Sequence, residues 1–252
     1  MAVPEFRVIG VTGMPMVQAG DDLAAQIIEA AAAQGTPLAA GDVVVVTQRI
    51  VSKVEGRVVP LDTFEPSPFA LAFATRWEKD PRVVEAVLRE SKRVIRQVGP
   101  VFITETHHGF KCANAGVDAS NVGGEGLVCL LPVDPDASCR RIRDAIRARA
   151  SIEVAVVMSD TFGRPWRLGQ TNIAIGVAGM LAMRDYVGKT DLDGHVLRVT
   201  MICDADEITG AAEMVMGKLD AVPAAIVRGF PYQPGEGSAQ EIVREQALDL
   251  FP

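Results

Sequence analysis

The sequence lacks the features that mark several common protein classes. Its four cysteines form no C-x-x-C pair, so neither a zinc site nor a disulfide framework is indicated, and we expect free thiols. No run of residues approaches the roughly 18 apolar positions of a membrane span. The first residues have no basic segment followed by a long apolar core, so they do not resemble a secretory signal. These absences predict a cytoplasmic protein that does not bind membranes.

The sequence also lacks an excess of positive charge and the best-known nucleotide and nucleophile motifs. Its net charge is -7, so we expect no general attraction to nucleic acid, and an anionic substrate would need a local basic pocket. There is no G-x-x-x-x-G-K-[ST], no G-x-G-x-x-G opening a helix and no G-x-S-x-G. A P-loop protein, a Rossmann dinucleotide site and catalysis by a side-chain nucleophile are therefore not expected.

The composition is that of a globular protein with a sizeable core. The 252 residues are 48% hydrophobic and 23% charged, enough for one large domain or two intimate lobes. Strand and helix patterns alternate early, and hairpins follow later, which predicts a mixed α/β (α+β) fold rather than a doubly wound one. No linker or repeat divides the chain, so we treat residues 1–252 as a single unit.

The hydrophobic patterns locate the expected elements. Asp21 and Asp136 are the expected caps of two helices, and the type of residues 49–61, helical turn or strand, is left open by periodicity. The expected strands cover residues 5–11, 42–48, 127–133, 154–158 and 223–229; the expected helices cover 22–34, 81–98, 136–150 and 207–217; and 186–203 form a hairpin.

A small-residue stretch at 112–126, CANAGVDASNVGGEG, is the first candidate for chemistry. Small residues let backbone amides approach a ligand closely, as in phosphate-binding turns. The carboxylate of Asp118 is a hard oxygen ligand of the kind that Mg²⁺ or Mn²⁺ prefers, and Asn121 follows it. By composition alone, a glycine-rich surface turn is the commoner explanation.

A second candidate follows the apolar run at 154–158. Asp160 comes where that strand is expected to end, a place where ligand sites gather, and Thr161 adds a hydroxyl. Arg164 and Arg167 could neutralise phosphate or carboxylate oxygens. A capped turn with two solvated arginines explains the same residues equally well.

Weaker candidates lie at other predicted strand ends. Gly13, Met14 and Pro15 follow the first strand, and Thr47, Gln48 and Lys53 lie at or beyond the second. The segment before the last strand, with Lys218, could contact a base or phosphate. Each of these is more often an ordinary loop or a solvated side chain.

Three longer motifs together resemble one known family. They are GVDASN at 116–121, SDTFGRPWRLGQTNIAIGVAGM at 159–180 and RDYVGKTDLDG at 184–194. All three are similar to coenzyme F420:L-glutamate ligase, also called F420-0:γ-glutamyl ligase, and the resemblance extends over nearly the whole chain. It is to the stand-alone form, without the nitroreductase-like domain that some relatives carry.

The resemblance implies an amide-forming ligase with a two-lobed mixed α/β fold, unlike P-loop or ATP-grasp enzymes. Such an enzyme joins L-glutamate to the carboxylate of F420-0, can add further γ-linked glutamates, and converts GTP to GDP and phosphate. It also implies Mg²⁺ or Mn²⁺, two ions per site, with K⁺ as a further cation, and an intertwined homodimer.

The resemblance further implies roles for individual residues. Asp118, Asp160 and Thr161 match metal-binding positions, and Arg164 and Arg167 are candidates for contacts to phosphate or substrate carboxylates. The nucleotide-binding matches are Gly13, Met14, Pro15, Met16, Thr47, Gln48, Lys53, Asn121, Gly217 and Lys218.

One position departs from the family pattern. Lys218 stands where some members have an acidic metal ligand, so a second metal would lose a protein ligand, or Lys218 itself contacts phosphate. Two alternatives stay open: a ligase of the same chemistry for another carboxylate acceptor, and a non-catalytic GTP-binding relative.

Overall fold

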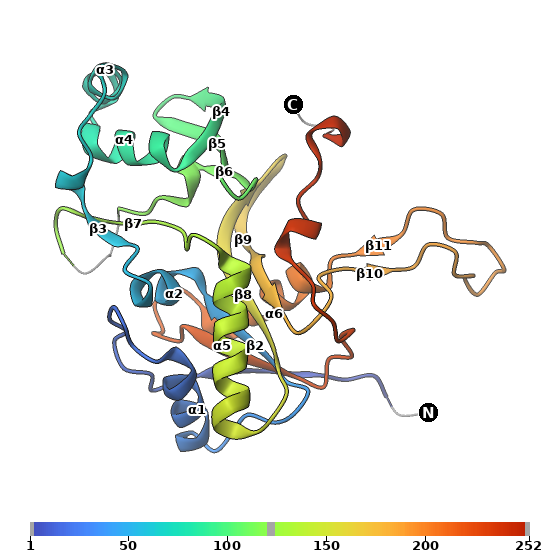
Figure 1. The fold of residues 1–252 in the computed structure, drawn as a ribbon. Coiled ribbons are helices and arrows are strands. Elements are labelled where there is room, and N and C mark those ends of the chain that lie inside the picture. The colour runs from blue at the N-terminus through green and yellow to red at the C-terminus, as the bar shows by residue number, and fades with distance from the viewer. Residues whose placement is uncertain (1–2, 120–123, 250–252) are drawn as a thin grey trace.

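A five-stranded mixed sheet lies at the centre of the structure, a computed structural model that describes residues 3–119 and 124–249 (Figure 1). Its strand order is β1-β12-β2-β8-β9, and only the β2–β8 pair is parallel. The mixed α/β class expected from the sequence is confirmed. The strands are β1 (Arg7–Val11), β2 (Val43–Thr47), β8 (Ala155–Arg164), β9 (Arg167–Ala178) and β12 (Ala224–Arg228).

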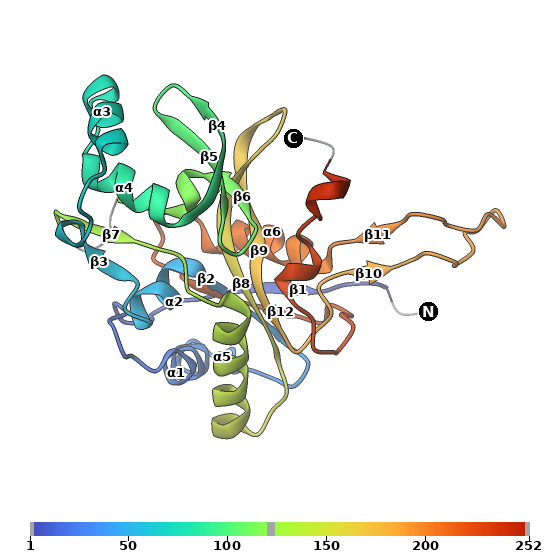
Figure 2. The same cartoon turned by 45° about the horizontal axis from the view of Figure 1, so that its top comes forward.

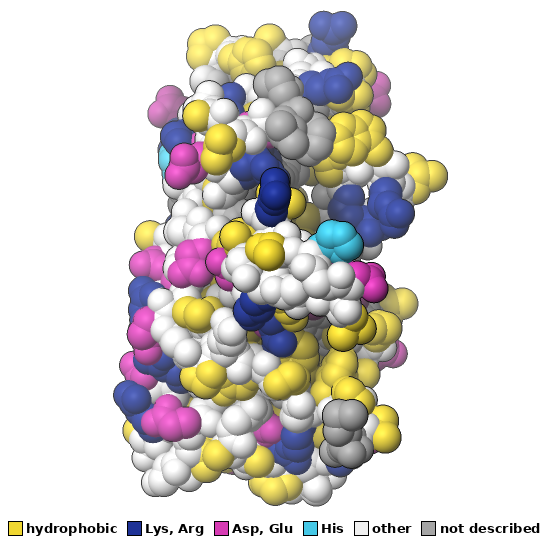
Figure 3. Space-filling view, turned by 90° about the vertical axis from the view of Figure 1, so that its right-hand side faces the viewer, with side chains coloured by type: hydrophobic (Ala, Val, Ile, Leu, Met, Phe, Trp, Pro, Cys, Tyr) yellow, Lys and Arg dark blue, Asp and Glu magenta, His cyan; other side chains and the backbone are white. Residues whose placement is uncertain are grey.

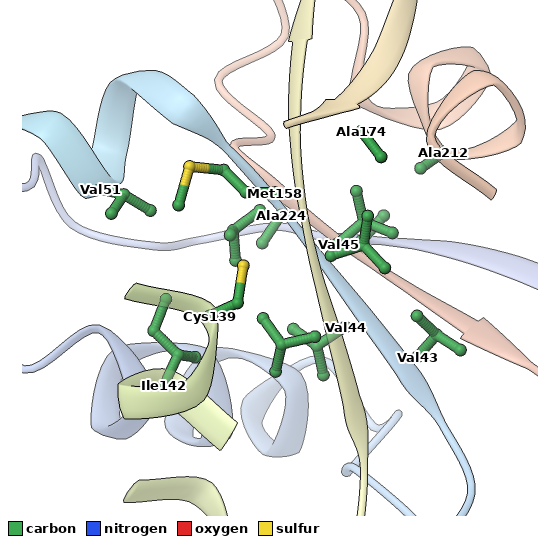
Figure 4. Packing of buried hydrophobic residues seen from close by; sticks show 14 of the residues in the cluster. Val43, Val44, Val45, Val51, Cys139, Ile142, Met158, Ala174, Ala212 and Ala224 are labelled. Atoms are coloured by element: carbon green, nitrogen blue, oxygen red, sulfur yellow. The ribbon is translucent and has the colours of Figure 1, made fainter. Parts of the chain in front are cut away.

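Helices cover both faces of this sheet. Helices α1 (Leu23–Ala33) and α5 (Pro135–Ala150) lie on one face, and α6 (Asp204–Met216) lies on the other (Figure 4). The four valines 43–46 of β2 are completely buried, as expected for a central strand covered on both sides. The uninterrupted apolar run of β2 follows from this position.

The segment between β2 and α5 builds the upper part of the molecule in Figure 1. It contains two small sheets, with strand orders β3-β7 and β4-β5-β6. It also contains two hydrophobic clusters, one of which includes the stacked rings of Phe73 and Phe102. The elements are α2 (Gln48–Val54), β3 (Val58–Pro60), α3 (Pro68–Trp77), α4 (Pro81–Arg89), β4 (Ser91–Val98), β5 (Val101–Thr106), β6 (Lys111–Ala113) and β7 (Leu127–Cys129).

A long hairpin arm projects from the body of the molecule. Strands β10 (Arg184–Asp185) and β11 (Met201–Ile202) pair at its base (Figure 1). The arm corresponds to the hairpin expected at 186–203, with its first strand starting two residues earlier. The four cysteines are free thiols, as predicted. Within the described residues, no helix is long and apolar enough to cross a membrane.

The expected helix over 81–98 is only half correct. Helix α4 ends at Arg89, and residues 91–98 form strand β4, paired with β5. The basic side chains of Lys92 and Arg93 contact Glu105 across the pair. These cross-strand ion pairs and the β-branched residues of the segment favour a strand, which periodicity did not separate from the preceding helix.

Two expected helix caps are wrong by one or two residues. Asp22, not Asp21, caps α1 by accepting the Ala25 N–H, and Asp134, not Asp136, caps α5. The carboxylate of Asp136 is buried instead, where it accepts the N–H of Val177 from β9. Residues 49–61, which the sequence pattern left open between helix and strand, contain most of helix α2 and the whole of strand β3.

Strand β8 is longer than predicted. It does not end near Met158 but continues to Arg164 and turns into β9. Its parallel partner β2 ends opposite Ser159, so the last residues of β8 leave the sheet as one side of a two-stranded hairpin. This hairpin rises beside β6 (Figure 2).

Gly176 lies where β9 passes α5 at close range. A Cβ at this position would stand 2.6 Å from the carbonyl oxygen of Pro135 and 3.0 Å from the sulfur of Cys139. We expect Gly176→Ala to lower the free energy of unfolding by about 1–3 kcal/mol, measured by urea denaturation. The control is Gly210→Ala on α6, because its new methyl group meets no described atom within 4 Å. We expect this variant to raise the free energy of unfolding by about 0.5–1 kcal/mol. Equal stability of Gly176→Ala and wild type would contradict this account of the contact.

Candidate functional site

The register of the sheet brings several predicted segments to one edge. Val11 at the end of β1 pairs with Ala224 at the start of β12, and Ala224 pairs with Val46. Thr47 in turn lies opposite Ser159 of β8. The ends of β1, β2 and the core part of β8 therefore meet the start of β12. The loops that follow or precede them share this edge, and the N–H of Thr47 donates to the carbonyl of Pro223 at 3.0 Å.

Asp160 is the first residue of β8 beyond the end of β2. The Thr161 N–H donates to its Oδ1 at 2.8 Å. Burial raises the pKa of Asp160 to about 6, against the opposing effects of the Thr161 N–H and the nearby charge of Lys218; the charge of Asp118 adds to the rise. The protein therefore does not fully offset the free-energy cost of the negative charge on Asp160. A bound cation would lower that cost.

Asp118 follows a turn with unusual backbone geometry, and its charge acts on Asp160. Asn114 and Ala115 both have positive φ, 50° and 55°, although neither is glycine. The hydroxyl of Thr104 accepts the Ala115 N–H at 3.0 Å, which fixes the turn. A backbone pair between Asp118 and Cys129 then holds the acid in place. Strained backbone of this kind is often kept at functional sites.

Arg49 links the two acids. Its guanidinium makes an ion pair with Asp118, and its charge also acts on Asp160. Arg49 lies on the first turn of α2, one residue after Gln48. The sequence reading missed it, because an arginine at the start of an amphipathic helix carries no distinctive signal.

A closed ring of hydrogen bonds stands next to Asp160. The Thr161 hydroxyl donates to Asn172 Oδ1 at 2.8 Å and accepts from Lys218 Nζ at 2.7 Å. The Asn172 amide nitrogen donates to Glu213 at 2.7 Å, and Lys218 makes an ion pair with Glu213 at 2.9 Å. Asn172 and Glu213 were also missed, since only the β8–β9 register and the packing of α6 bring them here.

The donor set fits a hard divalent cation with an incomplete protein shell. Asp118, Asp160 and Thr161 supply oxygen atoms, the ligands that Mg²⁺ and Mn²⁺ prefer. Among the described residues, no group of three or more His, Cys, Asp or Glu side chains could hold a metal by itself. An ion here would take further oxygens from water or from substrate phosphates, as Mg²⁺ usually does.

The residues of the expected nucleotide segments differ in their backbone conformation, exposure and hydrogen bonds. Gly13 lies in the loop after β1 with φ 75°, and Met16 in that loop is exposed. Gln48 is buried, and its amide nitrogen donates to Ser52 and to the carbonyl of Leu130, so it secures α2 to the upper part. Lys53 lies half-buried at the last turn of α2.

The expected nucleotide positions also include Gly217 and Asn121. Gly217 ends α6 with φ 55°, and a Cβ there would stand 2.5 Å from the carboxylate of Asp220, so this turn requires glycine. Asn121 lies outside the described residues.

Arg164 and Arg167 are not brought to the acids. They occupy the exposed tip of the β8–β9 hairpin, where Arg164 donates to the carbonyl of Leu168 at 3.4 Å. An extended strand rises about 3.3 Å per residue, so the backbone of Arg164 lies on the order of 13 Å from that of Asp160. Within one chain, these arginines therefore do not share the site of Asp118 and Asp160.

Comparisons with known proteins give a consistent picture. The family model described as "F420-0:Gamma-glutamyl ligase" matches residues 12–229. The chain is 45% identical to the coenzyme F420:L-glutamate ligase of Methanothermobacter thermautotrophicus, over 98% of each chain. It is 43% identical to the enzyme of the same name from Methanopyrus kandleri (99% of this chain, 98% of the relative) and 41% identical to that from Archaeoglobus fulgidus (97% and 96%).

Proposed function

Since the chain belongs to the F420-0:γ-glutamyl ligase family, we propose that it joins L-glutamate to the carboxylate of coenzyme F420-0, at the expense of GTP, in coenzyme F420 biosynthesis. The observation that supports this best is that Asp160 lies at the sheet edge where the expected nucleotide segments also end, near enough to Asp118 for the charge of that acid to act on it. Oxygen ligands and loop backbone at one edge suit the handling of a phosphate chain.

The proposed reaction has two steps. A carboxylate oxygen of F420-0 attacks the γ-phosphorus of GTP; the bond to the β-phosphate oxygen breaks, and GDP leaves. The amine of glutamate then attacks the acyl carbon, loses a proton and displaces phosphate, so that an amide forms. Neither step needs a covalent bond to the protein, which fits a site with positioned charges and no nucleophile–base pair.

Asp118, Asp160 and Thr161 are the residues that would hold Mg²⁺ or Mn²⁺. The bound cation would neutralise phosphate oxygens as charge moves onto them. The protein would fix the position of the cation through its backbone: Asp160 and Thr161 are part of strand β8, and Asp118 follows the strained turn. A second divalent ion and K⁺ belong to the proposal through the family resemblance.

The ammonium group of Lys218 lies beside the proposed cation position. It contacts both the Thr161 hydroxyl and the Glu213 carboxylate, and its charge acts on Asp160. We assign it a contact to phosphate rather than to metal, because an ammonium cannot replace a carboxylate ligand. Glu213 keeps the ammonium in place.

The direct test is a ligation assay. The protein is incubated with F420-0, L-glutamate, GTP and Mn²⁺, and we expect GDP together with a product heavier by one glutamyl unit, detected by mass spectrometry. Omission of glutamate is the control. Absence of the product with authentic F420-0 would overturn the proposal. Turnover only with another carboxylate acceptor would favour the alternative ligase, and GTP binding without turnover would favour a non-catalytic relative.

We also propose that the protein acts as a homodimer in the cytoplasm. The hairpin arm projects from the body and carries exposed apolar side chains, which a second copy could cover (Figures 1 and 3). These side chains are Val187, Leu192, Val196 and Val199.

A substitution in the arm tests the dimer. We expect Val199→Asp to shift the protein toward monomers in sedimentation velocity, because a carboxylate would be buried without a partner. Asp193→Asn in the same arm is the control and should leave the sedimentation coefficient unchanged. A wild-type protein that sediments as a monomer, or a Val199→Asp variant that still dimerises, would contradict this role of the arm.

A further inference from the structure

A cavity of about 370 Å³ opens beside Asp118 in the upper part of the molecule. Its walls come from α3, α4, β5 and the turn that carries Asp118. The volume is far larger than the voids of a well-packed core and falls in the range of small-molecule pockets.

Most residues that line the cavity are apolar, and two of them are aromatic. Phe73 and Phe102 stack with ring centroids 4.3 Å apart, and Val84 and Val87 of α4 are buried beside them. Such walls suit a planar aromatic ring system and do not suit the charged amino acid glutamate.

The polar groups of the cavity lie on its border. Lys79 brings an exposed ammonium, and Asn114 uses its side-chain oxygen to accept the Phe102 N–H. Asp118 belongs both to the border and to the pair of acids.

Asp118 lines the cavity, and its charge also acts on Asp160 at the sheet edge. The expected nucleotide segments, at the ends of β1 and β2 and before β12, lie on the sheet edge, whereas the cavity lies among α3, α4 and β5. A ligand with its ring in the cavity would point its polar end at the acids, opposite a nucleotide that arrives from the sheet edge.

We propose that this cavity binds the ring system of the carboxylate acceptor, with the acceptor's carboxylate directed to Asp118 and its negative charge met by Lys79. This inference rests on the proposed function and assigns the acceptor side of that site. Val83 lies half-buried on α4 at the cavity wall. A larger side chain at this position would fill part of the cavity and leave Asp118 and Asp160 unchanged.

The test measures the binding of F420-0 by its own fluorescence, without GTP or glutamate. We expect Val83→Phe to raise the Kd for F420-0 about tenfold or more, and Lys79→Gln to raise it about threefold to tenfold. Both variants should bind a fluorescent GTP analogue as the wild type does. Leu71→Phe, on the exposed side of α3, is the matched control for added volume.

The outcomes separate the two proposals. A wild type that neither binds F420-0 nor forms product overturns the proposed function and the cavity assignment with it. Normal wild-type ligation, with F420-0 affinities of Val83→Phe and Lys79→Gln equal to wild type, overturns the cavity assignment alone. Lys79→Gln removes only an exposed charge, so its binding result is informative even where Val83→Phe lowers the thermal stability.

Discussion

In the presence of a chelator at pH 7, Asp160→Asn is expected to be more stable than the wild-type protein, while its ligase turnover is lost. The physical reason for the first effect is the environment of the carboxyl. Burial raises the pKa of Asp160 to about 6, from an unfolded value of 3.8, so the folded protein holds its ionised form at a cost. An amide of the same shape carries no such cost.

The sign of the pH dependence follows from this direction. Above pH 6 the carboxyl is ionised in both states, and the folded state bears the full penalty, roughly 1–3 kcal/mol. Below about pH 4 it is protonated in both states, and the penalty vanishes. The contribution of Asp160 to stability therefore falls as the pH rises from about 4 to about 6, and the Asp160→Asn variant lacks this step.

The second effect comes from the loss of a cation ligand. Removal of the carboxylate should lower turnover by about a thousandfold or more, since several kcal/mol of charge stabilisation are involved. Urea denaturation with EDTA at pH 7 and pH 4 measures the stability, and mass spectrometry of the product measures the turnover. Asp193→Asn, on the exposed arm, is the control for the substitution itself. Near-normal turnover would remove Asp160 from the site, and unchanged stability at both pH values would contradict its uncompensated burial.

The parts of this fold that the sequence predicted are those set by local pattern. The valine run of β2 and the helix α1, apart from the identity of its capping residue, follow from their own residues. Strand β4 did not, because SKRVIRQV fits a helix as well as a strand until its partner β5 is known. Tertiary pairing decides such segments, which is why the expected helix extended too far.

The candidate site divides in a similar way. Asp118 and Asp160 were candidates as hard oxygen ligands, but Asp is also a common turn residue, and only the resemblance to the ligase family favoured a metal site over a plain turn. Arg49, Asn172 and Glu213 come from ordinary positions in regular elements, and only their packing shows their proximity.

The two arginines show the converse limit. Arg164 and Arg167 stand close to Asp160 in sequence, but β8 continues as an extended strand and carries them to the hairpin tip. Closeness in sequence gives closeness in space within a turn and not along a strand.

Asp118→Asn is expected to abolish turnover as well, but without the gain in stability. Asp118 and Arg49 form an ion pair in which both side chains are partly exposed, at 32% and 42%, so the pair contributes only about 0–1 kcal/mol to folding. The variant should therefore fold normally and lose turnover by about a thousandfold or more, because the cation loses the second of its two carboxylates.

Arg49→Gln distinguishes a metal ligand from a structural ion pair. In the protein, the guanidinium of Arg49 competes with any cation for the carboxylate of Asp118. We expect Arg49→Gln to bind Mn²⁺ about two to ten times more tightly than the wild type, since removing a nearby positive charge favours a bound cation. Asp118→Asn should bind Mn²⁺ more weakly, and electron paramagnetic resonance of free Mn²⁺ measures both changes. If Asp118→Asn leaves the Mn²⁺ affinity unchanged or raises it, then Asp118 serves Arg49 and not the cation. Opposite shifts would show that the Arg49–Asp118 ion pair must open or be shared before the site takes its metal.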